Sequence, residues 1–262
     1  ILAVANRPVE DTFNRALEGQ YPPGSTFKIV STAALLDAGL DPDEVVDCPA
    51  TTTVGGREFR NFEGAAAGAV PFSIDFAQSC NTAFVSLADR LEPTSLRDEA
   101  ELFGLGRSYE LALPAFSGSV PPGRDEVEEA AAMIGQARIL ASPLAMAGVA
   151  ATAQEGHWQR PRLLADDREQ AGPDLPADDA EALRVLMRSV VTSGTGTALA
   201  AVPGEPIGKS GTAEYGSGDP PPTHAWFVAA TADVAVAVLI EDRPSGGEFA
   251  APVVAEFLTA LG

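Results

Sequence analysis

Apolar residues recur at helical spacing over several stretches of the chain, and the clearest of these follows Ser25. The run starts at Phe27 and stops at Gly39, so we expect a helix that carries Ser25 in its first turn. The same pattern predicts helices, in places broken into pieces, over 73–91, 92–132, 133–153, 180–192 and 250–261. Helices are therefore expected to fill the middle of the chain.

Strand patterns lie mainly at the two ends. Residues 1–6 read as a strand, and strands spaced as an antiparallel meander are expected over 206–215, 225–231 and 234–240. Residues 41–68 are rich in turn residues, although Thr51 to Val54 can pair as a short hairpin, and 165–179 reads as an acidic surface loop. We expect an α+β fold in which an antiparallel sheet from both chain ends packs against a helical lobe of about residues 40–190. The active cleft would lie between the two.

Ser25 and Lys28 share a helix face because they are three residues apart, so the lysine amine can reach the serine hydroxyl. A serine hydroxyl needs a base before it can attack a substrate, and a partly deprotonated lysine can be that base. The alternative is a chance S-x-x-K sequence with the lysine in solvent. Lysine usage favours the catalytic interpretation: the chain has 17 basic residues, and Lys28 and Lys209 are its only lysines. Arginine cannot give up its proton in a protein, whereas lysine can.

Two further polar groups stand out against apolar surroundings. Ser79 and Asn81 interrupt the helical pattern of 73–91, and on an extended connection they would point the same way, with Cys80 facing inward. The alternative for Asn81 is a helix cap. Lys209 to Thr212, with a glycine at 211, lies on the first strand of the meander and suits the edge-on binding of an extended peptide. The alternative there is an ordinary hairpin strand.

Composition excludes several classes of function. The net charge is −20, which argues against nucleic acid and against an anionic membrane surface. No apolar run approaches the roughly 20 residues that span a bilayer, and the chain opens as though upstream sequence were missing. The two cysteines and two histidines show no metal-ligand spacing, so neither a metal nor a cofactor is expected. A Cys48–Cys80 disulfide and two separate buried thiols both remain open.

The three motifs S25-T-F-K28, S79-C-N81 and K209-S-G-T212 occur in a fixed order. Together they resemble the S-x-x-K, S-x-N and K-[ST]-G set of penicillin-binding proteins and serine β-lactamases. Flanking sequence resembles the transpeptidase domain of class B penicillin-binding proteins, most of all the actinobacterial penicillin-binding protein A type. The stretches that carry this likeness are YPPGSTFK, SCNTAF, IGQARILASPLAMA, VTSGTGTA, GKSGTAE and HAWFVA.

The resemblance implies a role for each motif residue. Ser25 would be the acylated nucleophile and Lys28 its base, with the backbone N–H groups of Ser25 and Thr212 as the oxyanion hole. Ser79 would relay a proton to the leaving amine, and Asn81 would hold the donor amide. The third motif would set the electrostatics and bind the terminal carboxylate through Lys209, Ser210, Gly211 and Thr212. Ser210 replaces the threonine of many relatives and keeps the hydroxyl.

The implied activity is a D,D-transpeptidase that cross-links peptidoglycan stem peptides and is acylated by β-lactams. A D,D-carboxypeptidase and a β-lactamase are rivals on the same scaffold, and a penicillin sensor or division scaffold without turnover is a rival of another class. The resemblance places the domain, residues 1–262, on the extracytoplasmic face of the bacterial cell membrane. The family's membrane anchor and N-terminal module are not among these residues. Other cell-wall synthesis or division proteins are candidate partners.

Overall fold

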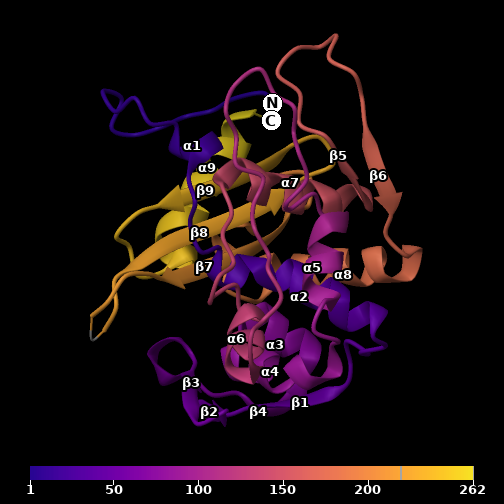
Figure 1. The fold of residues 1–262 in the computed structure, drawn as a ribbon, viewed down its shortest axis with the longest axis vertical. Coiled ribbons are helices and arrows are strands. Elements are labelled where there is room, and N and C mark those ends of the chain that lie inside the picture. The colour runs from indigo at the N-terminus through magenta and orange to yellow at the C-terminus, as the bar shows by residue number, and fades with distance from the viewer. Residues whose placement is uncertain (219, 262) are drawn as a thin grey trace.

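A three-stranded antiparallel sheet with helices on both faces organises the computed structural model, which describes residues 1–218 and 220–261 (Figure 1). The sheet order is β7-β8-β9, with strands Ile207–Glu214, Thr223–Ala230 and Ala235–Ile240. Ile207 lies opposite Ala230 in the first pair, and Ala225 lies opposite Ile240 in the second. The predicted meander is confirmed to within two residues at each end.

The remaining elements are mostly helical. The α-helices are α1 (Arg15–Glu18), α2 (Lys28–Asp37), α3 (Phe72–Gln78), α4 (Asn81–Ser86), α5 (Ser95–Leu102), α6 (Glu126–Ala132), α7 (Pro143–Glu155), α8 (Ala177–Thr192) and α9 (Ala251–Leu261). The short strands are β1 (Val45–Cys48), β2 (Thr51–Val54), β3 (Arg57–Arg60), β4 (Gly68–Pro71), β5 (His157–Gln159) and β6 (Ala171–Asp174). The short helical turns are η1 (Gly24–Phe27), η2 (Phe62–Gly64), η3 (Ala88–Arg90), η4 (Thr197–Leu199) and η5 (Gly246–Ala250).

Both faces of the sheet are covered, which explains why β8 is almost continuously apolar. Helix α7 packs on one face, and η5 and α9 pack on the other. Side chains alternate along β8, so Trp226 and Val228 belong to the main core, whereas Phe227 joins a second core with Val254 of α9. Covering both faces removes these side chains from water, which stabilises the sheet.

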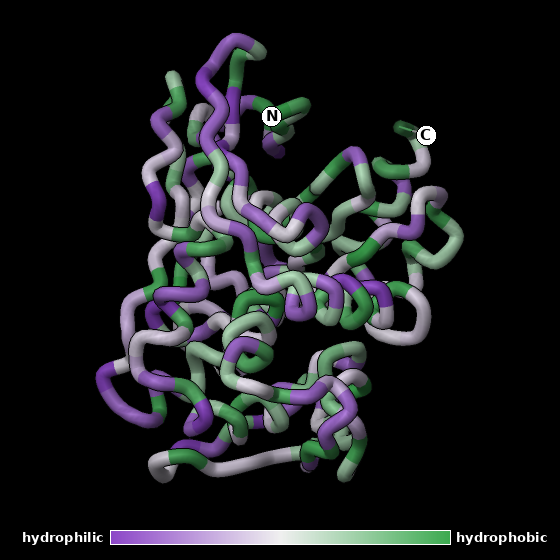
Figure 2. Tube along the Cα trace, turned by 90° about the vertical axis from the view of Figure 1, so that its right-hand side faces the viewer, coloured by the Kyte–Doolittle hydropathy of each residue, from purple (hydrophilic) through white to green (hydrophobic). Residues whose placement is uncertain are grey.

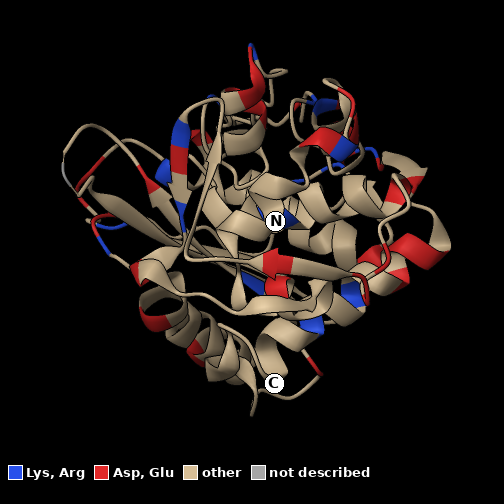
Figure 3. Cartoon of the chain, turned by 90° about the horizontal axis from the view of Figure 1, so that it is seen from below, with Lys and Arg blue, Asp and Glu red and all other residues tan. Residues whose placement is uncertain are grey.

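Helix α2 runs through the centre of the molecule and is buried along nearly its whole length (Figure 1). It packs against α5 and α8, while β1 to β4 gather with α3 and α4 at the far end of the molecule from the N-terminus. The loop between β5 and β6, the highest point of Figure 2, is mostly hydrophilic apart from its tip. Acidic residues are spread over the outer elements in Figure 3, and the net charge of the chain is −20.

The expected mixed α/β architecture is confirmed, but the strand predicted at residues 1–6 is wrong. In the structure these residues form no strand, and the sheet comes from the C-terminal part of the chain alone. Leu2 is 87% exposed and Val4 is 41% exposed, so the apolar run has no second layer to cover it. The segment is held by polar contacts instead: the amine of Ile1 donates to Arg162 O at 2.7 Å, and Asn6 Oδ1 accepts from Ala16 N at 2.9 Å.

Two other predicted segments differ from the structure. The long helix over 133–153 begins only at Pro143, because the Ser142 hydroxyl accepts from Ala145 N and caps the helix there. The acidic loop over 165–179 contains β6, which pairs with β5. The expected hairpin at Thr51 to Val54 is confirmed, since β2 pairs with β3.

Cys48 and Cys80 form a disulfide, so the alternative of two separate thiols is not what the structure shows. The bond ties the end of β1 to the residue just before α4. Both cysteines are buried. The disulfide therefore links the outer hairpin region to the segment that carries Ser79 and Asn81.

Candidate active site

Ser25 lies in η1, a turn that sits directly against strand β7. Gly24 has a φ of +53°, and a Cβ at this position would lie 2.5 Å from Thr212 O. Only glycine tolerates both the left-handed backbone and this close approach. The turn is anchored from the sheet as well, because Trp226 Nε1 donates to Pro22 O at 3.1 Å. Backbone contact thus places Ser25 beside Thr212.

Lys28 begins α2 and is completely buried. Its ammonium nitrogen donates to Asn81 Oδ1 at 2.8 Å, to Ser79 O at 2.7 Å and to Ser79 Oγ at 3.4 Å. Burial lowers the pKa of Lys28 well below its usual range; the charge of Lys209 lowers this pKa further and Asp75 opposes the shift. Such an amine gives up its proton more readily than a lysine in water.

Ser25 and Lys28 both form hydrogen bonds with Asn81 rather than with each other. Ser25 Oγ donates to Asn81 Oδ1 at 3.4 Å, the same oxygen that accepts from Lys28. Among the hydrogen bonds of the described residues, none joins Ser25 Oγ to Lys28 Nζ directly. Catalytic hydrogen bonds are often long before substrate binds, so this geometry is compatible with proton transfer.

Ser79 takes a left-handed backbone with a φ of +62°, so the expected extended connection is wrong. A left-handed residue ends α3 and lets the chain turn directly into α4. Asn81 is the first residue of α4, and the cap position belongs to Cys80, so Asn81 is not the cap either. Its side chain points to Ser25 and Lys28 instead.

A buried asparagine, Asn61, holds the start of α4 in place. Its Oδ1 accepts from the backbone N–H groups of Asn81 at 2.7 Å and Thr82 at 3.0 Å. Its Nδ2 donates to Pro49 O at 2.9 Å and Ala65 O at 2.8 Å. Asn61 therefore supplies the cap that the first helical N–H groups require and fixes the backbone of Asn81.

Lys209 enters the same cluster from strand β7. It is completely buried, and its Nζ donates to Ser79 Oγ at 2.8 Å and to Ser210 O at 3.1 Å. Burial lowers the pKa of Lys209 to about 7. The Ser79 hydroxyl thus bridges the two lysines. The next residue, Ser210, shares a 2.6 Å hydrogen bond between hydroxyls with Thr195.

Asp75 is a buried carboxyl one helical turn before Ser79. Neither of its side-chain oxygens has a hydrogen-bond partner. Burial raises the pKa of Asp75 to about 7, although the nearby charge of Lys28 lowers it. Its oxygen and the sulfurs of Cys48 and Cys80 lie within 4.8 Å of one another, but the disulfide leaves no thiolate for a metal ion. The donor set therefore does not suit a metal.

These side chains border an open cleft of about 1360 Å³, whose lining includes Ser25, Asn81, Thr195 and Thr212. One wall is strand β7, and another is the β2–β3 hairpin with the segment that follows it. In the sheet formed by residues 1–218 and 220–261, β7 pairs with β8 alone, so the other edge of β7 is available to a ligand. An extended peptide can add to such an edge.

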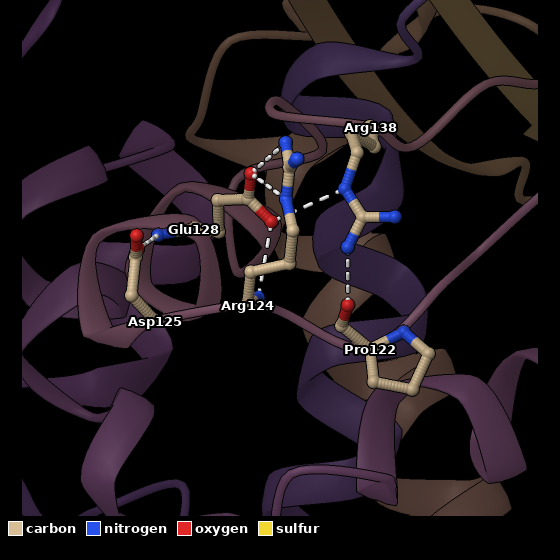
Figure 4. Close-up of polar contacts among 5 residues, drawn as sticks. All are labelled: Pro122, Arg124, Asp125, Glu128 and Arg138. Carbon is tan, nitrogen blue, oxygen red and sulfur yellow. Dashed lines mark hydrogen bonds and ion pairs between the residues drawn. The ribbon is translucent and has the colours of Figure 1, made fainter.

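Helix α6 completes the cleft with Ala131, and an ion-pair network fixes the start of this helix (Figure 4). Glu128 accepts from Arg124 at 2.6 Å and from Arg138 at 3.1 Å, while Arg138 also donates to Pro122 O. The hydrogen bond from Arg124 is the main reason why the pKa of Glu128 falls to about 2. The network ties the loop before α6 to the chain after it.

Comparison with known proteins agrees with this geometry. The penicillin binding protein transpeptidase domain family matches residues 1–259. This chain belongs to that family. The peptidoglycan D,D-transpeptidase PbpA of Mycobacterium tuberculosis is 36% identical over an alignment of 283 positions, which spans 95% of this chain and 57% of PbpA. PbpA of Mycolicibacterium smegmatis is also 36% identical, over 94% of this chain and 56% of its own length.

Solved transpeptidases share the fold. A ceftriaxone acyl-enzyme complex of penicillin-binding protein A from M. tuberculosis superposes with a TM-score of 0.86 at 33% identity, covering 98% of this chain and 64% of that one. The D,D-transpeptidase domain of a peptidoglycan glycosyltransferase from Eggerthella lenta gives 0.83 at 29% identity, over 96% of this chain and 68% of that one. The chain spans a little over half the length of the PbpA relatives. No helix among the described residues is both long and apolar enough to span a membrane.

The structure brings every motif residue of this transpeptidase domain to one cleft. Ser25, Lys28, Ser79, Asn81 and Lys209 form a continuous hydrogen-bonded cluster. Strand β7 carries Ser210, Gly211 and Thr212 along the cleft wall.

Sequence reasoning missed the supporting residues. Asn61 lay within the turn-rich stretch 41–68, and the four backbone groups that it bonds, from Pro49 to Thr82, are spread over more than 30 residues of sequence. Thr195 and Gln136 lie within the stretches VTSGTGTA and IGQARILASPLAMA, whose likeness to the family was the available signal. Their contacts with Ser210 and Glu214 depend on the fold.

Proposed function

We propose that this domain is a serine D,D-transpeptidase that acts on the D-Ala-D-Ala end of peptidoglycan stem peptides and is acylated by β-lactams. The observation that carries the proposal is the cluster in which Ser79 Oγ bridges two buried lysines beside Ser25. A lone serine in a cleft has no route for its proton, whereas this arrangement offers a base and a relay. PbpA of M. tuberculosis, a relative of 36% identity, carries the name peptidoglycan D,D-transpeptidase.

Acylation starts with neutral Lys28, whose Nζ takes the proton of Ser25 Oγ directly once bound substrate brings the two groups together, while Asn81 Oδ1 holds both beside each other. The freed Oγ attacks the carbonyl carbon of the scissile D-Ala-D-Ala bond, and the carbonyl oxygen becomes an oxyanion. The backbone N–H groups of Ser25 and Thr212 stabilise that charge. The proton then passes from Lys28 through the Ser79 hydroxyl to the leaving amine. The C–N bond breaks, D-alanine leaves, and an ester on Ser25 remains.

Substrate orientation comes from the cleft walls. The terminal carboxylate of the donor binds at Ser210 and Thr212, where Lys209 supplies positive charge and Gly211 allows close approach of the backbone. Ser210 is fixed by its hydrogen bond with Thr195. The Asn81 amide holds the donor amide. In the second half-reaction an amine of a neighbouring stem attacks the ester, and the same groups move the proton in reverse.

The setting of the domain follows from this chemistry. Peptidoglycan lies outside the cytoplasm, so we place the domain at the extracytoplasmic face of the bacterial cell membrane. We propose that residues 1–262 act as one transpeptidase domain, with the segment of about 40–190 forming the wall opposite the sheet. Other cell-wall synthesis or division proteins are its proposed partners.

Release of D-alanine from a stem-peptide mimic tests the proposal. The account predicts release that is abolished in Ser25→Ala and retained in Ser95→Ala, a control at the start of α5 that does not line the cleft. Addition of an amine acceptor should divert the acyl group into a cross-linked product. Release without any acceptor product would make the protein a carboxypeptidase, and no release would contradict the enzyme assignment.

A further inference from the structure

Arg60 and Glu214 approach each other across the cleft, just beyond the cluster around Ser25. Arg60 ends β3 and Glu214 ends β7, and their side chains lie 3.9 Å apart. Both line the cleft, and each side chain is about half exposed, at 58% and 51%. At this separation and exposure the pair is weak, so either charge is free to exchange its partner for a ligand group.

Each member of this pair is tied to the catalytic cluster through its backbone. Arg60 O accepts from Asn81 Nδ2 at 3.0 Å. The amide of Gln136, oriented to satisfy both groups, accepts from Glu214 N at 3.0 Å and donates to Glu214 O at 3.3 Å. The two charges therefore stand at a fixed place relative to Asn81 and Thr212.

Gln136 also occupies the unpaired edge of β7 at its last residue, Glu214. Residues two apart on a strand direct their backbone groups to the same side, so Thr212 presents its N–H and C=O to the cleft as Glu214 does. At Glu214 these groups are already paired with Gln136. A peptide added to β7 can therefore pair no further than Thr212. Beyond that point, recognition must rely on a side chain of the donor.

The direction of the donor identifies that side chain. With its carboxylate at Ser210 and its scissile carbonyl at Thr212, the donor runs toward Glu214, which lies two residues, or roughly 7 Å, further along β7. The residue just before D-Ala-D-Ala then reaches Arg60 and Glu214. This placement rests on the transpeptidase function proposed above.

We propose that Arg60 and Glu214 select a donor whose residue before D-Ala-D-Ala has a side chain ending in both an ammonium and a carboxylate. The carboxylate pairs with the Arg60 guanidinium, whose planar fork suits two oxygens, and the ammonium pairs with Glu214. A side chain of the diaminopimelate type provides both charges on one carbon. A lysine side chain satisfies Glu214 and leaves Arg60 without a partner.

Three donors test this specificity, each an Nα-acetylated residue followed by D-Ala-D-Ala: meso-diaminopimelate, lysine and norleucine. Release of D-alanine gives kcat/KM, and protection of Ser25 from a fluorescent penicillin gives donor binding without turnover. Both kcat/KM and donor binding should be higher for diaminopimelate than for lysine, and higher for lysine than for norleucine, by about threefold to tenfold at each step. Differences of this size are expected because each charge pair is partly exposed to water.

Variants assign the preference to the two residues. Arg60→Gln should lower kcat/KM for the diaminopimelate donor to that of the lysine donor. Glu214→Gln should lower kcat/KM for the lysine donor to that of the norleucine donor. Arg57→Gln is the matched control, because Arg57 shares β3 and the cleft lining but stacks over Phe59 at 5.2 Å. It should keep the wild-type order of donors.

The outcomes separate this inference from the proposed function. Equal kcat/KM and equal protection for all three donors would overturn the inference alone, as would an effect of Arg57→Gln equal to that of Arg60→Gln. Failure of Ser25 to react with penicillin would overturn the proposed function itself. If no D-alanine is released but the three donors protect Ser25 in the predicted order, the inference about Arg60 and Glu214 would stand and the proposed transpeptidase activity would be wrong.

Discussion

At the scale of single residues, two buried ammonium groups share the Ser79 hydroxyl. Like charges at this proximity in a buried site disfavour each other, which adds to the effect of burial on Lys28. One lysine is therefore neutral far more readily than a lysine in water. The account assigns that neutral state to Lys28 as the base, with Lys209 as the cation that faces the donor carboxylate.

Replacing Lys28 by arginine tests the base directly. Lys28→Arg should acylate with benzylpenicillin at less than about a tenth of the wild-type rate, a loss above roughly 1.4 kcal/mol, because arginine keeps the charge but not the ability to accept a proton. Stopped-flow measurement with a fluorescent penicillin gives the rate. A variant that retains more than this fraction would reduce Lys28 to an electrostatic neighbour.

Asp75 gives a prediction on stability against pH. Its folded pKa is about 7 against an ordinary value of 3.8, so the carboxyl destabilises the fold progressively as pH rises from about 4 to 7. Asn cannot ionise, so the stability gained by Asp75→Asn should grow between pH 5 and pH 8 by roughly 2–3 kcal/mol. Thermal melts at the two pH values measure this gain. The exposed Asp233→Asn, at the turn between β8 and β9, is the control, and a gain for Asp75→Asn that shrinks as pH rises would contradict the account.

Sequence alone pointed to the proposed catalytic residues more clearly than to the residues that surround them. Lys28 and Lys209 stood out because the chain otherwise uses arginine, and the three motifs fixed their partners. Asp75 carried no such signal, because an aspartate within a helical pattern looks like surface charge. Only the fold shows that both of its oxygens are buried without a partner.

At the scale of elements, the start of α4 depends on a side chain from another segment. Asn61→Ala removes four hydrogen bonds to backbone groups, as well as one to the Thr82 hydroxyl, and leaves the N–H groups of Asn81 and Thr82 without a cap. We expect a loss of about 2–4 kcal/mol in the free energy of unfolding, from urea titration, and slower acylation of Ser25.

Asn61→Asp keeps the acceptor for both N–H groups but turns a buried carboxylate oxygen toward the carbonyl groups of Pro49 and Ala65, so it should cost at least as much as Asn61→Ala. A loss below about 0.5 kcal/mol for Asn61→Ala, the size of an ordinary surface substitution, would show that α4 needs no such cap.

Element prediction succeeded where periodicity reflects burial and failed where it does not. The strands β7 to β9 were predicted because their apolar patterns and turns agree with a buried meander. Residues 1–6 have the same local composition, but Leu2 and Val4 meet no covering layer in the fold. The left-handed Ser79 was equally hidden, since a backbone turn of one residue leaves no periodic trace.

At the scale of the whole molecule, one segment of the chain, residues 111–124, bears on whether the protein is a target of β-lactams or an enzyme that destroys them. Rapid hydrolysis of the ester on Ser25 needs a second base aimed at water, and class A β-lactamases use a glutamate for this. In the corresponding part of this chain, residues 111–124 contain no carboxylate. The ester is therefore expected to persist.

Loss of label measures that persistence. After acylation with a fluorescent penicillin and removal of the excess, label should decline over many minutes or longer at neutral pH. Addition of unlabelled penicillin during the chase prevents rebinding and serves as the control. Turnover within seconds would move the protein to the β-lactamases.

Mass spectrometry after incubation with benzylpenicillin tests the central claim, that Ser25 is the nucleophile of this domain. The account predicts one adduct with the full mass of benzylpenicillin, because opening the lactam ring expels no fragment. The adduct should lie on the peptide that contains Ser25 and should be absent from Ser25→Ala, whose circular dichroism melt stays close to that of the wild type. An unmodified wild-type protein, or a stoichiometric adduct on folded Ser25→Ala, would contradict the account.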